Sequence, residues 1–201
     1  MSSNTATAFA TVDETLTPAH LDRARLFLEQ TQSGIEGAMK CVSEAQWNFK
    51  PAADRWSIAE NVEHIVAVQE RVLDHILPAL SEAPAPEPDY DREVVDSIVI
   101  HQFPTRLAKF SGPEAVRPKG GMQQPEALRR LGANYARFNV YLQSTPDMRR
   151  HAVASRPLEA VSGGKYTLMD GYQWVLAAAA HMERHTKQIL EVKAELAFPD
   201  K

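Results

Sequence analysis

Apolar residues recur at spacings of three and four in four segments of the chain, which is the pattern of an α-helix packed on one side. In the first segment, Thr17 is a capping residue and Pro18 suits the first helical turn, which predicts a helix over residues 18–42. The second segment begins at Ser57, and Glu60 gives it the S-x-x-E spacing of a capping box. Its apolar stripe continues to the proline-rich middle of the chain.

Two further helices are predicted in the second half of the chain. One begins at Gln124 and ends before Pro146, because proline cannot continue a helix. The other opens at Thr167, where Asp170 replaces the usual glutamate of a capping box, and reaches Leu196. Almost nothing between these segments has the alternating pattern of a β-strand. The four segments therefore predict an all-α protein.

Prolines mark the long connection between the second and third helices. Eight of the thirteen prolines lie between Pro78 and Pro125. We expect neither a regular helix nor a sheet in this connection, since the prolines interrupt both. A single long crossover allows two neighbouring helices of a bundle to run in the same direction. The pattern predicts a four-helix bundle in one domain, residues 18–201, after a mobile tail formed by residues 1–17.

Composition narrows the class of protein. The 201 residues are 44% hydrophobic and 24% charged, as in an average globular protein, and the net charge is −4. Without a cluster of Lys and Arg, this charge argues against a nucleic-acid partner. No apolar run reaches the roughly 18 residues of a membrane span, and the N-terminal residues lack the pattern of a secretion signal. Cys41 is the single cysteine, so we expect no internal disulfide and a cytoplasmic protein.

Two histidines stand four residues apart in the predicted fourth helix. This spacing places His181 and His185 one turn apart on one helix face, where both imidazoles can reach one metal ion. At about 100° per residue, Trp174 and Val192 share their side of the helix, whereas Glu183 points away. The pair therefore faces the core. Either a divalent metal takes a neutral nitrogen from each ring, or side chains and water satisfy both rings at a bundle end.

A credible metal site needs a third ligand, and His64 in the second helix is the best candidate. It lies on the flank of the apolar stripe of its helix, so its phase neither supports nor excludes coordination. His75 is three turns further along the same helix, too far for the same ion. The remaining histidines lie at a helix start or in loops, and we expect them to be bystanders: His20, His101 and His151.

Two segments that contain these histidines resemble motifs of a known protein family. The segment Arg55–Ile65 resembles the W-S-x-x-E-x-x-x-H motif that opens the second helix of the DinB-like superfamily. The segment His181–Ile189 is similar to the family's H-x-x-R-H-x-x-Q-I motif on the fourth helix. Both motifs occur in the expected order, and the resemblance spans residues 20–196. It implies a four-helix bundle with up-down-down-up topology, although the 81–124 connection is longer than usual and could cover the site or serve a dimer.

The resemblance also implies a metal centre in which His64, His181 and His185 bind one divalent ion. Zinc, nickel, manganese and iron are all compatible with imidazole ligands. Three neutral ligands leave positions open for water or a thiolate, as in catalytic sites. Family members resemble metal-dependent hydrolases or transferases of a low-molecular-weight thiol such as bacillithiol or mycothiol. Because Cys41 is near neither motif, thiol chemistry would use an external thiol.

Three functions follow from this reading. The leading hypothesis is a metal-dependent enzyme acting on a small molecule, as a hydrolase or a thiol S-transferase. The second is a stress-response module that binds a metal or ligand without turnover, and the third is a dimeric helical scaffold; the long apolar helices and the resemblance favour a homodimer. Among helper residues, Glu60 is more simply a capping partner than a general base, and Gln188 could orient a water or a ligating ring. We expect the tryptophans to be core anchors: Trp47, Trp56 and Trp174.

Overall fold

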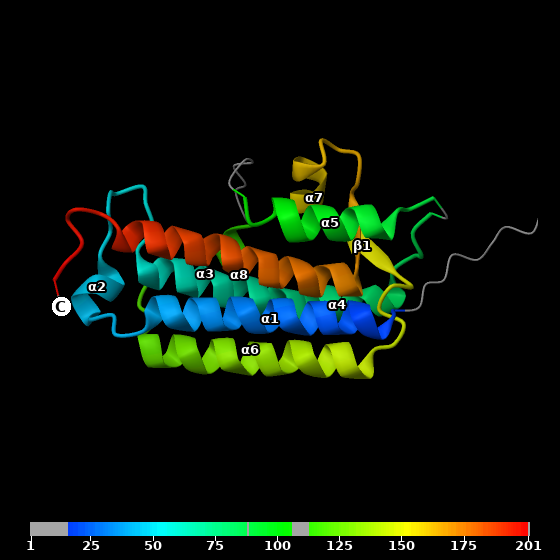
Figure 1. The fold of residues 1–201 in the computed structure, drawn as a ribbon. Coiled ribbons are helices and arrows are strands. Elements are labelled where there is room, and N and C mark those ends of the chain that lie inside the picture. Colours follow the sequence, from blue (N-terminus) through cyan, green and yellow to red (C-terminus); the bar gives the residue numbers. More distant parts are fainter. Residues whose placement is uncertain (1–15, 88, 106–112, 201) are drawn as a thin grey trace, which may run out of the picture.

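The computed structural model describes residues 16–87, 89–105 and 113–200, so nearly all of the predicted mobile tail lies outside the described residues. The described chain is mainly helical, which confirms the all-α class. Four long helices lie side by side and form the body of the molecule (Figure 1): α1 (Pro18–Met39), α3 (Ile58–Arg71), α6 (Gln124–Ser144) and α8 (Gly171–Lys193). A short helix, α2 (Glu44–Asn48), precedes α3.

Side-chain caps set the first turns of the long helices. The hydroxyl of Thr17 accepts a hydrogen bond from the backbone N–H of His20 at the start of α1, as the predicted cap requires. At the start of α3, Ser57 and Glu60 form the predicted capping box. Beyond α3 the chain stays helical through a π-helical turn and two short pieces: η1 (Val72–Ile76), α4 (Leu77–Ala79) and η2 (Leu80–Glu82).

The expectation that the proline-rich connection contains no regular helix was wrong. It contains α5 (Arg92–Gln102), a helix of 11 residues, followed by the short 3-10 turn η3 (Glu114–Val116). The sequence between Pro88 and Pro104 has no proline, which leaves room for three helical turns. The Asp91 side chain caps α5 by accepting a hydrogen bond from the N–H of Val94 at 3.1 Å. This helix packs against α8 on the outside of the four long helices (Figure 1).

The predicted start of the fourth helix was also displaced. Residues Leu168–Asp170 form strand β2, which pairs antiparallel with strand β1 (Ala152–Ala154), and helix α7 (Arg156–Val161) lies between them. Because the segment is extended in this ladder, Thr167 cannot cap the helix. The cap is Asp170, whose side chain accepts a hydrogen bond from the N–H of Gln173 at 2.9 Å, and α8 begins at Gly171.

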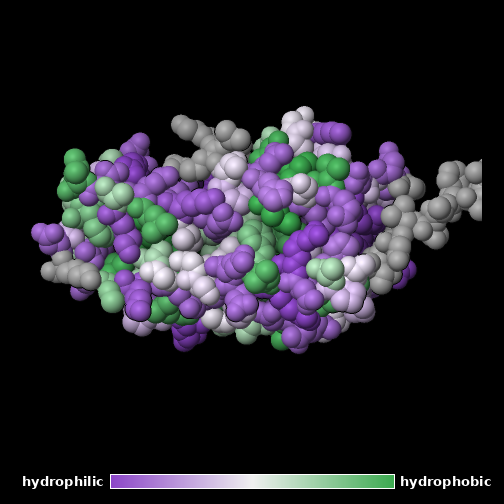
Figure 2. All heavy atoms as spheres, in the orientation of Figure 1, coloured by the Kyte–Doolittle hydropathy of each residue, from purple (hydrophilic) through white to green (hydrophobic). Residues whose placement is uncertain are grey.

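The core has two clusters of buried side chains along α8. One surrounds the first half of α8 and includes Phe138 and Tyr172. The other lies between α3, α6 and the second half of α8, and it includes Ile65, Leu131 and Met182. No helix of the described residues is long and apolar enough to cross a membrane. The face seen in Figure 2 is mostly hydrophilic, with separated apolar patches.

Candidate metal centre

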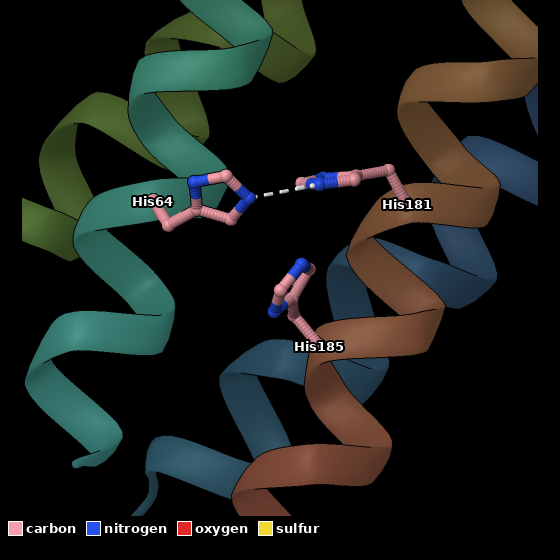
Figure 3. A group of neighbouring side chains, drawn as sticks. All are labelled: His64, His181 and His185. Atoms are coloured by element: carbon pink, nitrogen blue, oxygen red, sulfur yellow. Dashed lines mark hydrogen bonds between the residues drawn. The ribbon is translucent and has the colours of Figure 1, made fainter. Parts of the chain in front are cut away.

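Three histidines face a common space between α3 and α8 (Figure 3). His64 comes from α3, and His181 and His185 come from successive turns of α8. One nitrogen from each ring lies within 4.8 Å of the other two. His64 and His185 are buried, at 7% and 5% exposure, and His181 is partly buried. The packing of α3 against α8 therefore brings together the three residues that the sequence analysis proposed as metal ligands.

Hydrogen bonds fix the ring nitrogens of two histidines. His64 Nδ1 lies 2.6 Å from the carbonyl oxygen of Val116, and His185 Nδ1 lies 3.0 Å from Oδ1 of Asn61. Both oxygens can only accept, so each Nδ1 carries the proton and each Nε2 keeps its lone pair. Asn61 is one turn before His64 on the same helix. These two partners orient the rings so that unprotonated Nε2 atoms are available to a metal ion.

The donor set fits one small divalent ion. Nε2 of His64 and Nε2 of His181 lie 3.2 Å apart. Two imidazole nitrogens bound to one tetrahedral zinc at 2.0–2.1 Å would be separated by about 3.3 Å. Because His64 carries its proton on Nδ1, His181 Nε2 donates the hydrogen bond between these two atoms in the metal-free protein and must lose its proton before it binds a metal ion. His181 Nδ1 has no hydrogen-bond partner among the described residues, so the proton can move to that nitrogen. The three rings therefore need little rearrangement to act as ligands.

Burial keeps the three imidazoles neutral. It lowers the pKa of His181 and of His185 well below the usual value, and the neighbouring imidazoles and the nearby charge of Arg184 lower both further. Burial also lowers the pKa of His64, partly opposed by the hydrogen bond to Val116. Neutral imidazole is the form that binds metal, so the site is prepared for coordination at neutral pH.

Acid should destabilise the metal-free protein through these histidines. Each pKa is lower in the folded chain than the ordinary histidine value of 6.5, so below pH 6.5 the unfolded chain binds more protons. The free energy of unfolding should be highest above that pH and fall as the pH decreases, by up to about 1.4 kcal/mol per pH unit for each histidine. Urea unfolding across this range measures the slope, and His185→Ala should make it shallower. A stability independent of pH would contradict the prediction.

Trp56 forms one wall of the histidine cluster. Its ring centroid lies 4.9 Å from that of His64 and 5.8 Å from that of His185, and its plane is within 19° of the His185 ring. The expectation of a core anchor is confirmed for Trp47 and Trp174, which are 2% and 8% exposed. Trp56 is different: it is only partly buried and packs on the imidazoles, so it covers one side of the site.

The two proposed helper residues have separate roles. Glu60 accepts the N–H of Ser57 at 2.8 Å and pairs with the Lys50 ammonium at 2.8 Å, which confirms its capping role and occupies both of its oxygens. Gln188 lies one turn after His185, and its side chain raises the pKa of this histidine against the larger effect of burial. Its role in orienting a water or a ligating ring stays a prediction. The cluster of potential ligands contains no carboxylate among the described residues.

The other four histidines lie outside the cluster. His20 hydrogen-bonds with Thr17 and pairs with Glu93 at 3.1 Å, and His151 Nδ1 donates to the Ala83 carbonyl oxygen at 2.6 Å. The other two are exposed: His75 and His101. Two groups that orient the histidine rings were not predicted: the Val116 carbonyl and the Asn61 side chain. Asn61 could have been found from its spacing of three residues from His64, whereas a backbone carbonyl such as that of Val116 has no sequence signal.

Comparison with known proteins identifies the family of this chain. The structure defines a helical protein with a buried group of three histidines that can hold one metal ion. The family model of the DinB superfamily matches residues 28–189, so the chain belongs to the DinB superfamily, as the two motifs indicated. Divalent-metal binding is general in this family. No curated protein and no solved structure gave a significant match.

Proposed function

We propose that the chain binds one divalent metal ion through His64, His181 and His185 and acts as a metal-dependent enzyme on a small molecule. The observation that carries this proposal is the convergence of three neutral imidazoles within 4.8 Å, two of them with Nδ1 held by a carbonyl acceptor. Structural zinc sites are closed by four protein ligands. A site with three protein ligands instead leaves positions for water or substrate, as catalytic sites do.

The surroundings of the histidines suit catalysis, and they are compatible with more than one class of substrate. A divalent ion held by three neutral ligands would keep its whole positive charge. This charge would lower the pKa of a bound water to about 7 and favour a bound thiolate. Trp56 shields one side of the rings. Hydrolysis and thiol S-transfer begin from this same arrangement. Cys41 is exposed at the end of α1 and does not belong to the histidine group, so the thiol would be external.

A second candidate is a stress-response module that binds a metal or ligand without turnover. One observation favours it: the ligand group of the described residues has no carboxylate, and the oxygens of Glu60 are engaged in the helix cap and the Lys50 pair. A hydrolase usually positions a general base near the attacking water. Thiol transfer has a weaker need for such a base, because the metal itself keeps the thiol deprotonated.

We also propose that the four long helices form the up-down-down-up bundle of the family. The colour gradient in Figure 1 supports it, because α3 and α6 progress in one direction and α1 and α8 in the other. The connection of residues 83–123 between the second and third long helices is long enough to permit this parallel pair. A homodimer and a small-molecule substrate belong to the same proposal.

Metal-dependent turnover is the test of this function. Protein purified without metal-affinity resin should be stripped with chelator, reloaded separately with zinc, nickel, manganese or ferrous iron, and assayed on generic esters and amides and on thiol–electrophile pairs. We expect turnover with at least one metal and none in the stripped protein. Stoichiometric metal binding without turnover on any substrate class would favour the non-catalytic module. Failure to bind any metal would overturn both and leave the helical scaffold.

A further inference from the structure

The long connection between α5 and α6 reaches back to the histidine cluster at two points. Its η3 turn supplies the buried Val116, whose carbonyl oxygen accepts the hydrogen bond from His64 Nδ1. A few residues later, the backbone N–H groups of Lys119 and Gly120 donate to Oε1 and Oε2 of Glu63, at 3.0 and 2.9 Å. Glu63 is the immediate neighbour of His64 on α3. One helix therefore holds both the ligand and the anchor of the segment that orients this ligand.

The backbone at Lys119 and Gly120 is shaped to receive a carboxylate. Gly120 and Gly121 have φ angles of +82° and +92°, in the left-handed region that glycine adopts readily. Successive N–H groups in such a turn point to one side and form a concave site for an anion. Because both oxygens of Glu63 are used, this carboxylate forms two charge-assisted hydrogen bonds with one rigid turn. Glu63 thus fixes the position of residues 119–120 relative to α3.

We propose that Glu63 is a positioning residue for the metal centre. By holding residues 119–120, it keeps the Val116 carbonyl where it fixes the proton on His64 Nδ1 and directs Nε2 toward the other two histidines. This inference rests on the proposed function, since it assigns a role in metal binding. It also assigns a role to the long connection. The connection provides the Val116 carbonyl that orients His64, and it is anchored by Glu63, the residue next to His64.

A second anchor makes the effect of Glu63 measurable without loss of the fold. The indole N–H of Trp47 donates to the carbonyl oxygen of Met122 at 2.9 Å, and Trp47 is buried. The connection therefore stays attached to the bundle when the Glu63 contacts are weakened. What changes is the freedom of the turn between Val116 and Met122, and with it the orientation of the His64 ring.

The first test compares Glu63→Gln with Glu70→Gln. Glutamine has one acceptor oxygen, and its amide N–H₂ would face a backbone N–H donor, so the turn loses one hydrogen bond and gains a repulsive contact. We expect the zinc dissociation constant, measured by chelator competition, to rise about 10-fold, the lower end of the effect of losing a direct partner of a metal-ligating histidine, because Glu63 acts through the Val116 carbonyl. Glu70 is two turns along the same helix and pairs with Arg130, so Glu70→Gln should change it less than about twofold.

The second test perturbs the turn from its other side and leaves Glu63 in place. Gly120→Ala meets no atom within 4 Å but places a Cβ on a residue with φ of +82°, which opposes the turn. It should weaken zinc binding in the same direction as Glu63→Gln. Gly132→Ala is the matched control, because Gly132 lies in α6 with equally open space and no positive φ. It should bind zinc as the unaltered protein does.

Amide hydrogen exchange of the unaltered protein provides a readout that needs no variant. If metal binding and the Glu63 contacts stabilise the same arrangement, saturating zinc should slow exchange at Lys119 and Gly120, since coupling between two sites is reciprocal. Folded variants with unchanged zinc affinity, or exchange unaffected by zinc, would overturn the role of Glu63 while leaving the metal site in place. An unaltered protein that binds no zinc would overturn the proposed function itself.

Discussion

Replacing His185 by alanine is expected to lower the affinity for zinc by more than about 100-fold, beyond the effect of losing a residue that only orients a ligand. Two imidazoles would remain, and two protein ligands rarely hold a metal tightly. His64→Ala should have an effect of similar size, because His64 is the only member of the histidine group that lies on α3. Elemental analysis of protein purified without metal-affinity resin, followed by chelator competition, measures both variants against the unaltered chain.

The matched controls are histidines outside the cluster. His75 and His101 are exposed, so His75→Ala and His101→Ala change the histidine count without touching the site. Both should keep full metal content and an unchanged dissociation constant. Circular dichroism should confirm that every variant is folded, since His64 and His185 are buried. Full metal retention in folded His64→Ala and His185→Ala would contradict the proposed centre.

Local signals predicted the long helices well because their ends depend on neighbouring residues. The caps at Thr17 and Ser57 are formed within four residues of sequence, so the starts of α1 and α3 were predictable. The cap of α8 was misplaced by three residues because Thr167 is followed by strand β2, whose partner strand is more than ten residues away in the sequence. Helix α5 was missed because the prolines on either side outweighed the proline-free stretch between them.

The histidine cluster was predictable in part for the same reason. His181 and His185 lie on one helix, and their spacing and phase indicated a common direction. His64 could not be placed by phase, because its position depends on how α3 packs against α8. The Val116 carbonyl and its anchor at Glu63 depend on the path of a long connection, which no local pattern specifies. Only the family resemblance related His64 to the pair before the structure did.

A buried ionic network at the other end of α8 was also invisible in the sequence. Arg149, Asp96 and Asp170 are 3%, 1% and 0% exposed, and they come from three separate segments. The guanidinium donates to Asp96 Oδ2 at 2.5 Å and to Asp170 Oδ2 at 3.0 Å, and it lies 4.4 Å from the centre of the Tyr172 ring. Gln173 also donates to Asp96 at 2.9 Å. These contacts fasten α5 to the first turn of α8.

Arg149→Met is expected to destabilise the protein by about 3–5 kcal/mol, because it removes the cation that pairs with both buried carboxylates and leaves Asp170 with the more distant Arg92 at 4.0 Å. Urea unfolding of the metal-free protein measures the change. The matched control is Arg130→Met, whose pairs with Glu70 and Glu126 are more exposed, so it should lose no more than about 1 kcal/mol. A loss below about 1 kcal/mol in Arg149→Met as well would show that the network contributes little to stability.

The pH dependence of that loss distinguishes an ionic network from simple packing. Burial raises the pKa of Asp170 to about 6 even with Arg149 present, and removal of the guanidinium takes away the main opposing effect. In Arg149→Met the pKa of the carboxyl should therefore rise further above its unfolded value. An acid with a raised pKa in the folded state loses stability as the pH increases. The destabilisation should be larger at about pH 7.5 than at about pH 5, whereas a loss of packing alone would be the same at both.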